Sequence, residues 1–147
     1  MLGSEKLMDI ASSADQLTVR IFSFSFHKSL PNDESGNGGG FIFDARSLPN
    51  PGREERFREL TGKDASVIEY LNQQESVHRY FANVVSLVDT SVSSYQRRGF
   101  KNLMVSFGCT GGRHRSVFLA EELAKHLSAN HGVEAVVRHL ELEKVSQ

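Results

Sequence analysis

Hydrophobic and polar positions alternate along residues 17–26, where Phe22, Phe24 and Phe26 are separated by serines and follow several β-branched residues. This period of two is typical of a β-strand. Shorter apolar runs predict three further strands, over residues 41–45, 102–107 and 133–138. Residues 27–40 are rich in glycine, asparagine and serine, and this composition predicts a flexible loop between the first two strands.

A second periodicity, close to 3.6 residues, predicts helices between the strands. The longest helix begins at residue 76 and ends near Gly99, a residue typical of a helix C-terminus; its apolar positions are Val77, Phe81, Val84, Val88, Val92 and Tyr95. Another helix spans residues 116–130 and is closed by Gly132; its apolar face consists of Val117, Ala120, Leu123, Ala124 and Leu127. Two shorter helices are predicted at residues 53–60 and, with Asp64 as the N-cap, at residues 64–71.

The last elements follow the order strand, glycine-rich loop, helix, strand, which is that of a βαβ unit with two parallel strands. We therefore expect an α/β fold with a mostly parallel central sheet flanked by helices. The glycine-rich loop lies between the strand at residues 102–107 and the helix at residues 116–130. A chain of 147 residues fits one domain, which we place at residues 17–147 after a flexible tail at residues 1–16.

The composition narrows the classes of function. Hydrophobic residues make up 39% of the chain and charged residues 24%, which is ordinary for a globular protein. No apolar run is long enough to span a bilayer and no leader resembles a signal peptide, so we expect no membrane association. The single cysteine excludes an internal disulfide and predicts a free thiol in a cytoplasmic protein. With a net charge of −1, nucleic-acid binding would require a local basic patch.

The stretch GCTGGRHRSV, residues 108–117, carries the most informative chemistry. A glycine-rich turn between a parallel strand and a helix presents backbone N–H groups and the helix N-terminus to an anion. Arg115 can donate two hydrogen bonds to phosphate oxygens, and the hydroxyls of Thr110 and Ser116 can add more. This pattern predicts a phosphate-binding loop; the alternative is that Gly111 and Gly112 form only a tight turn beside solvated arginines.

Cys109 and Arg115 also have the C-x5-R spacing of cysteine-dependent protein tyrosine phosphatases. In that chemistry Cys109 would attack phosphorus as a thiolate, Arg115 would hold the phosphate, and Asp44 would protonate the leaving oxygen. Against this alternative, Gly108 stands where the phosphatase signature has histidine, and no Trp-Pro-Asp-like acid loop is present. A lone cysteine at a strand end is also typical of a small buried hydrophobic residue.

The order of motifs along the chain is more specific than any single motif. The chain contains, in this order, SFSF, FDARSLPNP, LTG, GCTGGRHRSV and RHLELEK. Over residues 18–144 it resembles the C-terminal domain of the RapZ family of RNase adapter proteins. The resemblance implies a domain that binds glucosamine-6-phosphate, a phosphorylated amino sugar. It also implies that the full-length protein binds a small regulatory RNA and presents it to a ribonuclease.

Carried over by motif, the resemblance implies a ligand pocket formed by Thr110, Gly111, Gly112, His114, Arg115 and Ser116, together with Asp44 and Arg46. Loop amides and Arg115 would hold the phosphate, and Asp44 would accept hydrogen bonds from sugar hydroxyls or an ammonium group. For Asp44 the alternative is a structural carboxylate paired with Arg46 or Arg115. For His114 the alternative is a packing or capping role. No metal ion and no cofactor are expected.

The chain departs from the family pattern in ways that bear on its partners. It contains no G-x-x-x-x-G-K-[ST] motif, so we expect a stand-alone domain that leaves any kinase or ATPase activity to a partner protein. Its last residues, LELEKVSQ, are near neutral where the family often has a basic cluster, which argues against RNA binding. An RNA surface would be formed by Arg97, Arg98, Lys101 and Arg138, with Arg113 and His139; the alternative is that these are solvated charges.

Three functions therefore remain open. We place first a regulatory domain that senses a phosphorylated sugar or another anion. An RNA-binding adapter comes second and a cysteine-dependent phosphatase third, so we expect binding rather than catalysis.

Overall fold

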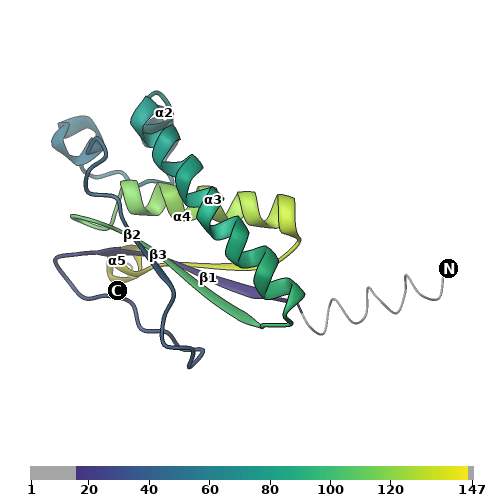
Figure 1. Ribbon diagram of the computed structural model, residues 1–147. Helices are drawn as coiled ribbons and strands as arrows, with labels where there is room; N and C mark the ends of the chain where they lie inside the picture. The colour runs from purple at the N-terminus through teal and green to yellow at the C-terminus, as the bar shows by residue number, and fades with distance from the viewer. Residues whose placement is uncertain (1–15, 146–147) are drawn as a thin grey trace.

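Four parallel strands form the sheet of the computed structural model, which describes residues 16–145 (Figure 1). They are β1 (Thr18–Ser25), β2 (Phe41–Asp44), β3 (Asn102–Cys109) and β4 (Glu134–His139), in the order β2-β3-β1-β4. Each strand begins and ends within two residues of its predicted limits, and the predicted α/β class is confirmed. The tail expected at residues 1–16 lies outside the described residues, apart from Gln16.

β1 is an inner strand that separates β3 from β4. The two strands of the predicted βαβ unit are parallel, as expected, but they are not neighbours, because β1 pairs with both. The helix between them, α4 (Arg115–His131), contacts all three strands. Since β1 is covered on both faces, Ser23 and Ser25 are as buried as Phe22 and Phe24. The alternation along β1 therefore marks two buried faces.

The described residues contain three other α-helices: α2 (Ala65–Asn72), α3 (Glu75–Arg97) and α5 (Leu140–Val145). The predicted long helices are confirmed as α3 and α4, and Gly99 and Gly132 follow them with φ angles of +71° and +63°. The buried face of α3 consists of Val77, Val84, Val88 and Val92. Asp64 stands at the N-cap of α2, but its carboxylate accepts a hydrogen bond from the Thr61 N–H rather than from the helix. No helix within residues 16–145 is long and apolar enough to cross a membrane.

The helix predicted over residues 53–60 is wrong. Two single 3₁₀ turns, η1 (Pro51–Arg53) and η2 (Glu55–Phe57), stand there instead. Glu54 between them is extended, with φ −99° and ψ 127°, so the helical hydrogen bonds cannot continue. The Asn50 carboxamide accepts the Gly52 N–H at 2.9 Å, and buried Phe57 anchors the second turn. α5 was not predicted, because six residues are too few to show a helical period.

The helices α3 and α4 lie on the same side of the sheet, and the loop of residues 26–40 passes on the other side (Figure 1). The main core lies between the helices and the sheet and includes Val19 and Ile21 of β1, Val105 and Phe107 of β3, Val88 of α3, and Leu119 and Leu123 of α4. Because the strands are parallel, their carboxyl ends all meet at one edge of the sheet. In α/β folds this edge is where ligands bind, and the glycine-rich loop follows β3 there.

Candidate anion-binding site

A cleft of about 440 Å³ lies at the carboxyl edge of the sheet, between the segment after β2 and the glycine-rich loop. It is lined by Arg46, Ser47, Leu48, Pro49, Asn50, Arg53, Ser76, Thr110 and Arg115. Three of these residues carry guanidinium groups, and no carboxylate is among them. A cavity with this lining attracts anions, because guanidinium groups bind phosphate and carboxylate oxygens in a fixed fork geometry.

Arg115 is the most constrained of the three arginines. Its side chain is buried, and Nη1 donates hydrogen bonds of 2.9 Å to the carbonyl oxygens of Arg46 and Leu48. Nη2 makes only a long contact of 3.4 Å to the Thr110 hydroxyl. Nε is buried and has no acceptor among the described residues. One edge of the guanidinium thus fixes the segment after β2, and the Nε–Nη2 edge remains suited to two hydrogen bonds with an oxyanion.

The backbone of the glycine-rich loop is arranged to present donors. Within residues 16–145 the N–H groups of residues 111–114 have no hydrogen-bond acceptor. The loop ends at α4, whose first turn has no side-chain cap, so the positive end of the helix dipole lies beside the loop. α3 likewise begins without a side-chain cap, and Ser76 in its first turn lines the cleft. Two helix N-termini therefore add to the positive potential of the arginines.

Asp44 is engaged by Arg46 rather than exposed to the cleft. Its two carboxylate oxygens accept hydrogen bonds from Arg46 Nε at 2.9 Å and Nη2 at 2.7 Å. The hydrogen bond from the Arg46 side chain is the main reason that the pKa of Asp44 lies below its usual value. The Arg46 guanidinium also stacks over the Phe26 ring at 4.1 Å. This geometry matches the alternative in which Asp44 is a structural carboxylate, and it orients Arg46 at the cleft wall.

His114 and Ser116 point away from the cleft. His114 Nε2 lies 2.9 Å from the Phe57 carbonyl oxygen, and burial lowers the pKa of this imidazole. The Ser116 hydroxyl is buried and accepts a hydrogen bond of 3.1 Å from Cys109 Sγ. Cys109 is 2% exposed and belongs to the main core. These three side chains support the loop from behind.

The residue before Cys109 has to be small. A Cβ atom at Gly108 would lie 2.5 Å from the Phe24 ring and closer still to the Phe26 ring. The histidine of the phosphatase signature therefore cannot occupy this position without moving two aromatic side chains.

Of the eight predicted ligand residues, the structure brings Arg46, Thr110 and Arg115 together at the cleft wall. Gly111 lies beside it with open space around its α-carbon, whereas Gly112 is packed against the end of β1. The prediction missed Arg53 and Ser76, as well as Ser47 and Asn50. Arg53 was assigned to a regular helix, and Ser76 follows the LPNP motif by more than twenty residues. The turn-forming residues PNPG, directly before Arg53, were a signal that the chain turns there, but no local signal points to Ser76.

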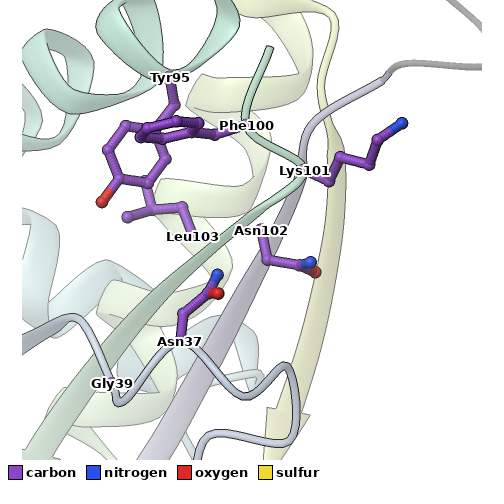
Figure 2. Close-up of a pocket in the computed structure, with 7 residues that line it drawn as sticks. All are labelled: Asn37, Gly39, Tyr95, Phe100, Lys101, Asn102 and Leu103. Atoms are coloured by element: carbon purple, nitrogen blue, oxygen red, sulfur yellow. The ribbon is translucent and has the colours of Figure 1, made fainter. Parts of the chain in front are cut away.

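The residues proposed for RNA binding fall into two separate places. Arg97, Arg98 and Lys101 are exposed at the start of β3. They adjoin a hollow of about 430 Å³ lined by Asn37, Gly39, Tyr95, Phe100, Lys101, Asn102 and Leu103 (Figure 2). Figure 2 shows Tyr95 and Phe100 side by side, with the Lys101 side chain extending away from them. Arg98 stacks on Phe100, with 4.7 Å between its Cζ and the ring centroid.

Arg138 lies near the opposite edge of the sheet. Glu134 of β4 stands level with Asn102, the first residue of β3. Arg138 follows Glu134 by four residues, so it lies about 13 Å further along the strands. Its guanidinium forms ion pairs with Glu143 at 3.0 Å and Glu34 at 3.2 Å. Its neighbour His139 is largely buried, with Nδ1 2.6 Å from the Ser23 hydroxyl, and burial lowers the pKa of its imidazole. The four basic residues therefore do not form one surface.

The fold and the cleft define an α/β domain that gathers three arginines at the carboxyl ends of parallel strands. The chain belongs to the RapZ C-terminal domain family, whose model matches residues 17–143. It is 38% identical over 130 residues to a nucleotide-binding protein of Xylella fastidiosa strain M23, covering 88% of this chain and 43% of that protein. It is 39% identical over 129 residues to a nucleotide-binding protein of Xanthomonas axonopodis pv. citri strain 306, covering 88% and 44%. The chain thus spans less than half the length of these curated relatives.

Proposed function

We propose that this domain binds a phosphorylated metabolite in the cleft at the carboxyl edge of the sheet and acts as a sensing, regulatory domain. The observation that carries the proposal is the convergence of Arg46, Arg53 and Arg115 on one cleft, where Nε of Arg115 has no acceptor among the described residues and Nη2 has only the long contact to Thr110. A buried guanidinium N–H without an acceptor costs about 1–3 kcal/mol. A phosphate oxygen would remove that cost, and a neutral ligand would not neutralise Arg53 and Arg115, whereas Arg46 already has Asp44 as its counter-ion.

The cleft offers a division of labour for a sugar phosphate. Its volume of about 440 Å³ lies within the range of small-molecule sites. Arg115 and the loop N–H groups would hold the phosphate, while Arg46 and Arg53 would neutralise its charge from the outer wall. The polar groups of Ser47, Asn50 and Ser76 would then meet sugar hydroxyls. Glucosamine-6-phosphate is the first ligand to test, because the family resemblance implies it.

Calorimetric titration tests this proposal. We expect glucosamine-6-phosphate to bind and glucosamine not to bind, because the phosphate supplies most of the interaction. Arg53→Gln should weaken binding about tenfold, since it removes one charged hydrogen-bond donor from the cleft wall. Arg56→Gln is the matched control, because this exposed arginine of the next 3₁₀ turn lies outside the cleft. Equal losses in both variants, or equal binding of the two sugars, would contradict the proposal.

A second function, contact with single-stranded RNA, is supported by one further observation. Phe100 is 40% exposed and stands beside Arg97 and Arg98. The aromatic ring offers a surface on which a base can stack, and the arginines add positive charge next to it. This pairing of an exposed aromatic side chain with arginines is the common design of sequence-tolerant single-strand binding. We propose the surface of Arg97, Arg98, Phe100 and Lys101 as the place of such a contact, without Arg138.

Gel shifts with a short single-stranded RNA test the second function. Binding should weaken steeply with salt, and Arg97→Glu/Arg98→Glu should abolish it. Phe100→Ala should weaken it about tenfold by removing one stacking partner. The control is Arg56→Glu/Arg79→Glu, which changes the net charge by the same amount as Arg97→Glu/Arg98→Glu but on exposed residues outside the proposed surface. If this control abolishes binding as fully as the first pair, the contact is unspecific and the proposed surface is wrong.

No observation favours the phosphatase alternative. The Cys109 thiol faces the interior and donates to Ser116, so an aryl phosphate in the cleft would not meet it. Asp44 is held in an ion pair with Arg46 and has a lowered pKa, whereas a general acid needs a raised one. The geometry therefore favours binding over phosphate transfer.

A further inference from the structure

Three side chains converge between α3 and α4, away from the cleft and outside the motifs that carry the family resemblance. Asp89 projects from α3, His126 from α4, and His131 from the last residue of α4. The Nε2 atoms of the two histidines lie 2.9 Å and 2.8 Å from the same Asp89 oxygen, Oδ1. All three side chains are partly buried, with 14–33% of each exposed. The cluster is therefore sheltered but open to small solutes.

We propose that Asp89, His126 and His131 form a binding site for a divalent first-row transition-metal ion of the Zn²⁺ class. Two imidazole nitrogens and one carboxylate oxygen form a donor set that suits these ions. Mg²⁺ and Ca²⁺ prefer sets made of oxygen ligands only, so they should bind poorly. The site is separate from the proposed phosphosugar cleft and does not depend on it.

The spacing of the donor atoms fits a small metal ion. No two of the three ligand atoms lie more than 4.8 Å apart. Around a tetrahedral ion with ligand distances of 2.0–2.1 Å, ligand atoms lie about 3.4 Å apart. The widest pair would have to close by no more than about 1.4 Å, and the two nitrogen–oxygen pairs would open from 2.8 and 2.9 Å. Rotations of these partly exposed side chains provide both movements. With three ligands from the chain, at least one coordination position is left for water or a partner's side chain.

The proton balance of binding is simple. In the metal-free geometry each Nε2–H donates to Asp89, and His126 Nδ1 lies 3.2 Å from the Asn130 carboxamide. On binding, each imidazole releases its Nε2 proton to solvent and takes a proton from solvent at Nδ1, so the ring stays neutral and presents the Nε2 lone pair to the ion. Asn130 would then turn its carboxamide oxygen toward His126 Nδ1 and accept that proton. Asn130 is thus a positioning residue that holds the ring, as outer-shell partners of metal-bound histidines do.

A hydrogen bond beside the cluster joins the two helices that would supply the metal ligands. The Gln96 side chain of α3 donates to the His131 carbonyl oxygen at 3.1 Å, which joins the C-terminal parts of α3 and α4. The cluster lies about 17–24 Å along the helices from Ser76 and Arg115, the residues by which α3 and α4 line the cleft. A metal ion here would cross-link the two helices whose N-termini form the cleft.

Metal titration of the untagged, chelator-treated protein tests the proposal. One equivalent of ZnCl₂ should compete with a zinc-sensitive indicator, and a hundredfold excess over Kd should raise the melting temperature by about 5–10 °C. MgCl₂ at the same concentration should leave it unchanged. His126→Gln and His131→Gln should each remove the shift, and Asn130→Ala should weaken binding about 10- to 100-fold.

His27→Gln and Cys109→Ser are the controls, because they remove another histidine and the one thiol while leaving the cluster intact. Both should bind Zn²⁺ like the unmodified protein. Circular dichroism verifies that each variant is folded. The proposal is overturned if the folded, unmodified protein shows no shift with Zn²⁺, or if the shift survives in both His126→Gln and His131→Gln.

Discussion

Gly112→Ala should destabilise the fold strongly, whereas Gly111→Ala, one residue earlier, should not. Gly112 has a φ of +71°, where an alanine costs roughly 1–2 kcal/mol. Its new Cβ would lie 2.8 Å from the Ser25 N atom and 2.9 Å from the Phe24 carbonyl carbon. These atoms belong to the backbone of β1 and cannot move cheaply, and forced overpacking costs about 1–3 kcal/mol more. Together the two effects predict a loss of about 2–5 kcal/mol.

Gly111 provides the matched control. Its φ is not positive, and a Cβ there would have no atom within 4 Å. Alanine at this position should change stability by no more than about 0.5 kcal/mol. Urea unfolding followed by circular dichroism measures both free energies. Two results would show that the glycine-rich loop does not pack on β1 as described. One is a free energy of unfolding for Gly112→Ala within about 0.5 kcal/mol of that of the unmodified protein, and the other is an equal loss of this free energy in both variants.

Two other consequences can be measured. Burial lowers the pKa values of His114 and His139 in the folded protein. The unfolded chain therefore binds more protons than the folded protein at acid pH, and the free energy of unfolding should fall as pH drops below about 6.5. His114→Gln/His139→Gln should flatten this slope and exposed His27→Gln should keep it; an unchanged slope in the double variant would contradict the assignment. The Cys109 thiol, 2% exposed, should react with a disulfide reagent only when the protein opens, and Cys109→Ser should retain ligand binding. Immediate reaction in native buffer would show that the thiol faces the cleft.

Local periodicity was sufficient to predict most of the elements. The long helices were recognisable because their apolar residues return every three or four positions, and this repetition is visible within each helix's own sequence. The same reasoning failed at residues 53–60, where Pro51 and the extended Glu54 limit the chain to single turns. It also missed α5, which is too short to repeat a pattern.

The order of the motifs was enough to indicate the RapZ C-terminal domain family, which the match over residues 17–143 confirms. Motifs do not distinguish a residue at the cleft wall from one behind it. Arg115 and Ser116 are adjacent in the glycine-rich loop motif, yet one lines the cleft and the other is buried against Cys109. Successive residues at the start of a helix point about 100° apart, so their surroundings depend on what packs on each side.

What the sequence determined by itself was therefore the chain of local elements, the family and the position of the glycine-rich loop that we propose binds an anion. Only the tertiary structure decided that β1 lies between β3 and β4, and that Arg53 and Ser76 join Arg115 at one cleft. It also brought Asp89 within hydrogen-bonding distance of His126, 37 positions away along the chain. The physical reason is that periodicity reflects each element's own geometry, whereas these contacts depend on strand order and helix packing, which no local window of residues contains.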